Sequence, residues 1–172
     1  MKLLSLFLFA FSLNGAMLIS PQEAMSYSYG KDAKVVKKNI LLSKKQASII
    51  QKEAKVKLKS KIFRIFKATK EDKLLGYGIL VNKKVRSKNA VVLYFISDGV
   101  LRGIEIVAFN EPMEYLPSKN WNSQFEGVQT DKMLRVSKEI PTISGATLSA
   151  RTITDGSRLA FALYNELLKD KE

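Results

Sequence analysis

Residues 43–60 repeat their apolar positions with the period of a helix. Ser43 opens the segment and Gln46 follows three residues later, which is the spacing of a capping box. Apolar residues then recur every three or four positions, at Ala47, Ile50, Ala54 and Leu58. The opposite side is basic and carries Lys44, Lys45, Lys52, Lys55 and Lys59. The pattern predicts an amphipathic basic helix.

Strand-like patterns follow this helix, in residues 62–66, 74–81, 90–96 and 101–109. Asn82-Lys83-Lys84 is expected to turn the chain, and Asp98-Gly99 is a hairpin signal between the last two segments. Gly76-Tyr77-Gly78 lies inside a strand pattern and lacks the spacing of a nucleotide-binding loop, which favours a bulge. Together these segments predict a four-stranded antiparallel meander.

The pattern changes after Asn110. Residues 111–117 form a predicted loop, residues 119–125 a short helix that Gly127 ends, and residues 128–143 an irregular segment. Residues 148–169 then predict a long helix with Gly156 on its apolar face, a sign of close approach to another element. We therefore expect an α+β fold. An antiparallel sheet of about four or more strands would carry an N-terminal basic helix and a long C-terminal helix packed on it.

The first residues have the character of a targeting segment. Lys2 precedes an apolar run from Leu3 to Leu13, which is typical of a secretory signal peptide, and Ala16 offers a cleavage site. An uncleaved membrane anchor and other cleavage points remain open. The expected organisation is a signal peptide at 1–16, a linker at 17–40 and one domain at 41–172. The protein would be exported, periplasmic or on the outer side of the cytoplasmic membrane.

Composition limits the chemistry that the chain can perform. The 172 residues include no cysteine and no histidine, which excludes thiolate nucleophiles, iron–sulfur clusters, Cys/His zinc sites and Ser-His-Asp catalysis. A carboxylate-only site for Mg²⁺ or Ca²⁺ stays open, but no pattern points to one. Redox work would therefore need a cofactor, and we expect an organic one.

The net charge of +13 is concentrated in the first part of the chain. Residues 1–70 hold 15 Lys and Arg against 3 Asp and Glu, whereas residues 71–172 hold 14 against 13. The basic helix could simply present a solvated face, or it could contact an anionic membrane surface or an acidic partner. We expect no nucleic-acid partner for an exported protein.

The segment that leads into the last helix has the properties of a phosphate site. The first N–H groups of a helix have no internal partner and lie at the positive end of its dipole. Gly145 and Ala146 leave room for a bulky ligand, and hydroxyls come from Ser144, Thr147 and Ser149. Arg151 follows one turn later. The alternative is an ordinary helix cap, because Ser and Thr are favoured there for capping alone.

Ser144-Gly145-Ala146-Thr147 resembles the flavinylation motif of the FMN-binding domain family. This family includes the C subunit of the sodium-pumping NADH:quinone reductase and the G subunit of the Rnf electron-transport complex. The resemblance implies that Thr147 carries FMN through a phosphoester, attached by a flavin transferase with FAD as donor. Ser144, Gly145 and Ala146 would frame the phosphate, and Leu148, Ser149 and Arg151 would complete the cofactor contacts on this helix.

The resemblance extends over roughly residues 70–168. Residues 111–116 lie where family members have a loop that covers the flavin, which implies contacts from Glu111, Tyr115 and Leu116. Residues 121–127 resemble the next family stretch, and Trp121 could stack on the flavin, although plain core packing is the alternative for these residues. Pro141 stands where the family often has Asp, which leaves non-covalent FMN open.

These features predict an exported electron carrier or redox-system module rather than a complete enzyme. No residue is expected to act as a catalytic acid, base or nucleophile on a substrate. The partners would be the flavin transferase and redox proteins that the sequence does not identify. The alternatives are a cofactor-free basic module that binds anionic lipid, polymer or an acidic partner, and a stand-alone flavin reductase or oxidase.

Overall fold

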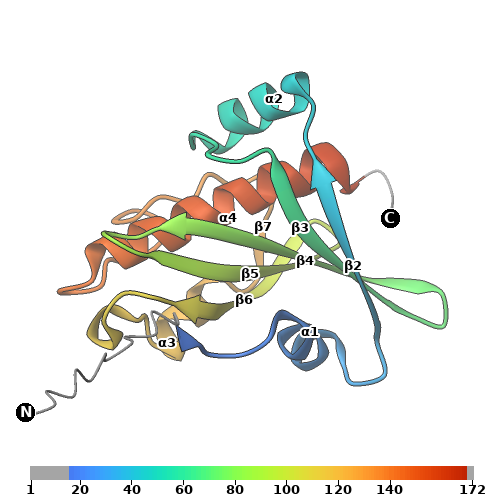
Figure 1. Cartoon of the computed structure of the whole chain (residues 1–172), viewed down its shortest axis with the longest axis horizontal. Coiled ribbons are helices and arrows are strands. Elements are labelled where there is room, and N and C mark those ends of the chain that lie inside the picture. Colours follow the sequence, from blue (N-terminus) through green and yellow to red (C-terminus); the bar gives the residue numbers. More distant parts are fainter. Residues whose placement is uncertain (1–15, 170–172) are drawn as a thin grey trace, which may run out of the picture.

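The structure is a computed structural model that describes residues 16–169. Its strands are β1 (Ala16–Met17), β2 (Lys34–Leu41), β3 (Ile62–Lys70), β4 (Lys73–Lys84), β5 (Asn89–Ser97), β6 (Val100–Phe109) and β7 (Val128–Gln129). Its helices are α1 (Pro21–Tyr29), α2 (Lys44–Ala54), α3 (Lys119–Asn122) and α4 (Thr147–Leu167), with 3₁₀ turns η1 (Met113–Tyr115) and η2 (Ser123–Phe125). All strand pairs are antiparallel, in the order β1-β6-β5-β4-β3-β2, and β7 pairs with β6 (Figure 1). The predicted α+β fold is confirmed.

The four predicted strands form the centre of the sheet as β3, β4, β5 and β6. Asp98 and Gly99 connect β5 to β6 as expected, and both have positive φ. The register shifts beside Leu75, so the predicted bulge near Gly76 is present. The predicted turn at residues 82–84 is wrong, because β4 continues to Lys84 and pairs it with Asn89. The chain turns at residues 85–88 instead.

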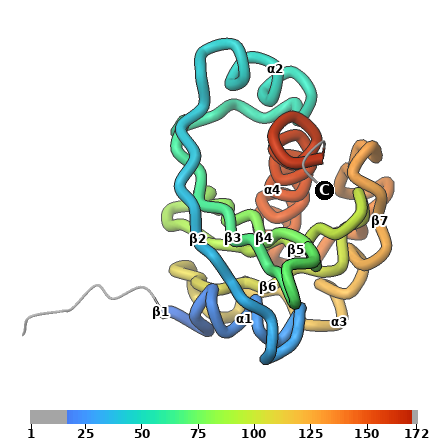
Figure 2. Tube along the Cα trace, turned by 90° about the vertical axis from the view of Figure 1, so that its right-hand side faces the viewer, coloured from blue at the N-terminus to red at the C-terminus, as the bar shows by residue number. Residues whose placement is uncertain are grey.

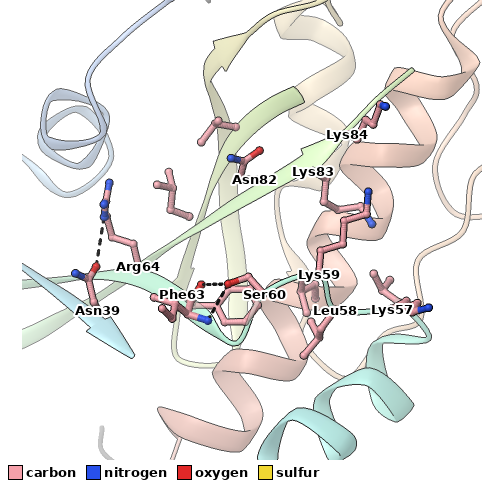
Figure 3. A pocket seen from close by; sticks show the side chains of 15 residues that line it. Asn39, Lys57, Leu58, Lys59, Ser60, Phe63, Arg64, Asn82, Lys83 and Lys84 are labelled. Atoms are coloured by element: carbon pink, nitrogen blue, oxygen red, sulfur yellow. Dashed lines mark hydrogen bonds between the residues drawn. The ribbon is translucent and has the colours of Figure 1, made fainter. Parts of the chain in front are cut away.

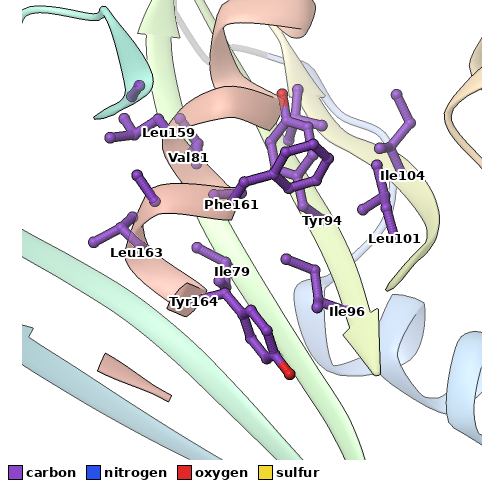
Figure 4. Close-up of a cluster of buried hydrophobic side chains, with 14 of the residues drawn as sticks. Ile79, Val81, Tyr94, Ile96, Leu101, Ile104, Leu159, Phe161, Leu163 and Tyr164 are labelled. Carbon is purple, nitrogen blue, oxygen red and sulfur yellow. The ribbon is translucent and has the colours of Figure 1, made fainter. Parts of the chain in front are cut away.

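Helices cover both faces of the sheet, which explains the nearly continuous apolar run of β5. Tyr94 and Ile96 face the core beneath α2 and α4, whereas Leu93 and Phe95 face α1. Figure 4 shows the larger core, where Phe161 and Tyr164 of α4 lie over the strands. Figure 2 shows α2 and α4 on one side of the sheet and α1 on the other.

Helix α4 lies close to the sheet at Gly156. A Cβ at this position would overlap the Tyr94 hydroxyl, so only glycine permits the observed separation. The same hydroxyl donates a hydrogen bond to the Ile153 carbonyl oxygen at 2.7 Å, and Tyr94 is fully buried. The predicted close approach at Gly156 is therefore confirmed. It sets the position of α4 along β5.

Arg158 connects α4 to two other segments. Its guanidinium donates to the carbonyl oxygens of Ala54 and Leu134, both at 2.9 Å, and forms a 2.7 Å ion pair with Asp155. The carbonyl of Ala54 belongs to the end of α2, where helix carbonyls lack an internal partner. One side chain thus holds the end of α2 against α4.

Helix α2 has the predicted capping box but is shorter than expected. The Ser43 hydroxyl accepts from the Gln46 N–H, and the Gln46 side chain accepts from the Ser43 N–H. The helix ends at Ala54 instead of near residue 60, because Lys55 takes a left-handed conformation. The Gln51 side chain then accepts from the Leu58 N–H at 2.8 Å, which keeps this segment out of the helix.

The predicted linker at residues 17–40 is wrong as a description of local structure. These residues contain α1 and most of β2, which pairs along its whole length with β3. Met25 of α1 packs where Gly78 leaves space, since a Cβ on Gly78 would overlap its sulfur. The Tyr29 hydroxyl donates to the carbonyl oxygens of Tyr77 and Ile96 at 3.0 and 3.1 Å. The start of α1 carries local signals, with Ser20 as N-cap and Pro21 in the first turn, which the linker interpretation overlooked. Its contacts with β4 and β5 could not be found from local pattern.

Most of the predicted signal peptide, residues 1–15, lies outside the described residues, and export therefore stays a prediction. Within residues 16–169, no helix has the length and apolar character needed to cross a bilayer.

Gly156→Ala tests the docking of α4. Alanine favours a helix by about 1 kcal/mol over glycine, but overpacking against Tyr94 costs about 1–3 kcal/mol and displaces the Tyr94–Ile153 hydrogen bond. We expect a net loss of stability, with a melting temperature a few degrees lower by circular dichroism. Ser48→Ala, an exposed change in α2, should leave it unchanged. A Gly156→Ala protein at least as stable as the wild type would contradict the close contact.

Candidate functional site

The N-terminus of α4 differs from the starts of the other described α-helices. Helices α1, α2 and α3 are capped by the hydroxyls of Ser20, Ser43 and Ser118. Helix α4 begins after Ala146 with no side-chain cap, although Ser144 and Thr147 lie within reach in sequence. The Thr147 hydroxyl makes only a long contact of 3.5 Å to the Ile143 carbonyl oxygen. The ordinary-cap alternative therefore does not describe this segment.

A cavity of about 260 Å³ opens at this uncapped end. Its lining is formed by three segments: the turn after β4, the region around η1 and the start of α4. The lining residues are Val85, Arg86, Glu111, Tyr115, Gly145, Ala146, Thr147, Leu148 and Ser149. A 21-residue helix thus directs its unpaired first N–H groups and the positive end of its dipole at a cavity.

Ser149 lines this cavity and carries an unsatisfied polar atom. Its side chain is buried, and its hydroxyl has no hydrogen-bond partner among residues 16–169. Buried hydroxyls are almost always hydrogen-bonded in folded proteins. The fold therefore leaves this hydroxyl without its usual partner, in a residue that lines the cavity.

Glu111 is buried and holds the turn between β4 and β5. One carboxylate oxygen accepts from the backbone N–H groups of Arg86, Ser87 and Lys88 at 3.0, 2.6 and 2.7 Å. These bonds, first that from the Lys88 N–H, hold the pKa of Glu111 below its usual range. Glu111 therefore shapes the cavity by fixing the turn that carries Arg86.

Tyr115 reaches the cavity from η1. The hydrogen bond and charge of Glu114 raise the pKa of the Tyr115 phenol, while nearby Arg86 opposes this shift. The phenol is therefore neutral at ordinary pH, with its proton directed to Glu114, and its ring can serve as an aromatic surface.

Four residues of the predicted set lie apart from the cavity lining. Leu116 packs against the larger core, and Ser144 and Arg151 are exposed. Trp121 is buried edge-on against Phe125 at 5.2 Å between ring centroids, and its indole N–H donates to the Pro141 carbonyl at 3.0 Å. Trp121 thus supports the loop that leads to Ser144.

The sequence analysis missed Val85 and Arg86. Both lie in the short turn at residues 85–88, whose polar and basic composition indicates only exposure to solvent. Nothing local shows that this turn faces α4, because the approach depends on sheet register and on the distant Glu111 carboxylate. The Glu111 hydrogen bonds join residues that are distant in the sequence, so only the tertiary structure reveals them.

No family model matches the chain. Among curated proteins, the chain is 32% identical over 83 residues to the G subunit of the Na⁺-translocating ferredoxin:NAD⁺ oxidoreductase complex of Acetobacterium woodii. This match covers 42% of the chain and 40% of that relative. The chain thus matches less than half the length of this relative.

A solved structure shares the fold. The chain resembles the crystal structure of NqrC from Shewanella oneidensis with a TM-score of 0.54 and 15% identity, over 81% of both chains. Together with the match to the Acetobacterium woodii protein, this likeness confirms the resemblance that the sequence indicated.

Glu111→Gln tests the carboxylate that holds the Arg86 turn. A depressed folded pKa stabilises the protein above the unfolded pKa of about 4.3, and that contribution is lost as pH falls through the folded pKa. We expect the melting temperature of Glu111→Gln to lie several degrees below wild type at pH 7, with the difference shrinking below about pH 4. Glu114→Gln, an exposed neighbour, is the control. If the difference in melting temperature between wild type and Glu111→Gln did not change with pH, the ionised Glu111 carboxylate would not be the group that stabilises this turn.

Proposed function

We propose that this chain is an FMN-binding electron-transfer protein whose cofactor occupies the cavity at the start of α4. The observation that carries the proposal is the uncapped N-terminus of a long helix, beside a buried hydroxyl without a partner among the described residues. A phosphate is the group that such a helix end favours. The similarity to the G subunit of a ferredoxin:NAD⁺ oxidoreductase complex supports a redox role.

The cavity fits the two chemical parts of FMN. The first N–H groups of α4, the Ser149 hydroxyl and the Arg86 guanidinium offer donors to a phosphate. Leu148 lines the cavity and is exposed, and Met113 is exposed in the same short helix as Tyr115. Exposed apolar side chains of this kind suit a flat aromatic ring system. When bound, FMN would supply one- and two-electron redox chemistry.

Thr147 is the attachment residue in this proposal. Its hydroxyl is exposed and does not cap the helix. With FAD as donor, the hydroxyl oxygen forms a bond to the phosphorus of the FMN half, its proton leaves, and the bond to AMP breaks. A separate flavin transferase would catalyse this exchange. A phosphoester keeps the flavin on an exported protein, where lost cofactor could not be replaced.

The chain is also proposed to work with redox partner proteins outside the cytoplasmic membrane. The Acetobacterium woodii relative is named as part of a complex, which supports redox partner proteins for this chain as well. We propose an exported carrier that works outside the cytoplasmic membrane, near an anionic membrane surface, and passes electrons between proteins. The absence of a side-chain cap on α4 disfavours the cofactor-free alternative, in which residues 144–147 serve only as a cap.

Thr147→Ala tests the attachment site. The full-length chain would be produced with a flavin transferase and FAD, denatured, and weighed as the intact protein. We expect wild type to be heavier by one FMN less one water, and Thr147→Ala to be unmodified. Thr142→Ala, an exposed threonine in the same loop, should be modified like wild type.

Two other results would revise the proposal. A yellow wild type that releases its flavin on denaturation would show binding without attachment, as Pro141 in the motif allows. A colourless wild type, produced beside a control protein that does become flavinylated, would refute FMN binding.

Arg86→Gln tests the contribution of the turn after β4. Its charged donor should be worth about 1.5–3 kcal/mol to a phosphate, or roughly 10- to 100-fold in Kd. We expect this weakening of free FMN binding in the Thr147→Ala background, measured by quenching of flavin fluorescence. Lys88→Gln removes the same charge from the same turn outside the cavity lining and should change Kd less than about threefold. If both variants raised the Kd for FMN equally, Arg86 would contribute only through its general positive charge and not through a direct contact with the phosphate.

A further inference from the structure

A second, larger cavity lies where the sheet divides. Strand β3 pairs with β4 only as far as Arg64 and Leu80, whereas β4 continues to pair with β5 up to Lys84. Strand β3 instead stays with β2 to its end, at Leu41 and Ile62. The two pairs of strands therefore separate, and a cavity of about 410 Å³ opens between them beneath residues 56–60 (Figure 3).

The rim of this cavity is strongly basic. Its cationic lining residues are Lys57, Lys59, Arg64, Lys83 and Lys84. No carboxylate lines the cavity among the residues that the structure describes. Figure 3 shows the side chains of Lys59 and Lys83 reaching toward one another from the segment after α2 and from β4. The charge of Lys59 acts on Lys83, and an anion between the two ammonium groups would offset their repulsion.

The ammonium of Lys83 is incompletely compensated. Its side chain is only 22% exposed, and Asp155 lies 3.8 Å away. Asp155 is shared, since its other oxygen pairs with Arg158 at 2.7 Å. Burial is the main cause that lowers the pKa of Lys83, with Arg158 and Lys59 acting in the same direction and Asp155 against it. A further negative charge in the cavity would stabilise this group.

The floor of the cavity is apolar. Val56, Phe63 and Leu159 are buried there, and Leu58 and Leu80 are partly buried. A volume of about 410 Å³ lies within the range of small-molecule sites, which combine an apolar lining with a few polar groups. Inorganic phosphate would use the cations and leave the apolar floor in contact with water.

We propose that this cavity binds a small organic anion with an apolar body and a phosphate or carboxylate group. The Lys59 and Lys83 ammonium groups hold the anionic group, and Phe63 and Leu159 contact the apolar body. The site is separate from the proposed flavin site, since the two cavities share no lining residue. It also gives a role to part of the basic excess of residues 1–70, beyond a solvated surface.

The test uses 1-naphthyl phosphate as the probe, with the full-length protein and isothermal titration calorimetry. We expect it to bind at least tenfold more tightly than either inorganic phosphate or 1-naphthol, which each carry one half of its chemistry. The affinity should fall as salt is raised. Equal binding of 1-naphthol, or equal binding of inorganic phosphate, would overturn the proposal.

Paired substitutions locate the site. Lys59→Gln with Lys83→Gln should weaken binding at least tenfold. Folding should tolerate the change because a repulsion is removed and Asp155 keeps its closer ion pair with Arg158. Lys37→Gln with Lys38→Gln removes the same charge from exposed positions of β2 outside the cavity and should weaken binding less than twofold. If the Lys59/Lys83 variant melted at a lower temperature than the wild type, its weaker binding could reflect lost stability. A second double variant of the cavity lining, Lys57→Gln with Lys84→Gln, should then also weaken binding.

Two results would place the probe elsewhere. If Arg86→Gln rather than the Lys59/Lys83 pair abolished binding, the probe would occupy the cavity at α4, and the second site would be refuted without affecting the FMN proposal. Vesicles of phosphatidylcholine and phosphatidylglycerol distinguish a lipid source. The protein could sediment with these vesicles but fail to bind the soluble probe. If both double lysine variants then reduced sedimentation equally, the lysines would form a general basic surface, and the proposed cavity site would be refuted.

Discussion

The contact of Gly156 with Tyr94 determines where α4 lies on the sheet, and the candidate site depends on that position. The Tyr94 hydroxyl bonds to the backbone of α4 at Ile153, so the helix is held both by shape and by a buried hydrogen bond. Because α4 is a single rigid element, fixing its middle also fixes its N-terminus about two turns away. Arg158 adds a second attachment, through the end of α2.

The candidate site joins segments that are far apart in the sequence. Its helix end comes from residues 145–149, whereas its opposing wall comes from the turn after β4. Glu111 holds that turn with hydrogen bonds from three successive backbone N–H groups, which a carboxylate satisfies better than any neutral side chain. Its buried charge therefore serves structure, and Arg86 is the group that it presents to the cavity.

The end of β4 and the turn after it supply cations to both cavities. Lys83 and Lys84 line the larger one, and Arg86 lines the one at α4. The division of the sheet between β3 and β4 separates the two sites, because β4 continues there without β3 as a partner. Positive potential at this end favours anions in either cavity, and it would also stabilise the negative charge that a flavin gains on reduction.

The sequence by itself determined the four central strands, the helices α2 and α4, and the motif at residues 144–147. Helical spacing, the Ser43 capping box and the Asp98-Gly99 turn are local features, and the structure contains each of them. Tertiary structure decided how residues 21–41 join the fold, since α1 packs on Gly78 and β2 pairs with β3. It alone also brought Arg86 to the start of α4, left that helix uncapped and opened the second cavity. These features arise from sheet register and from contacts between distant residues, and local propensity carries no information about either.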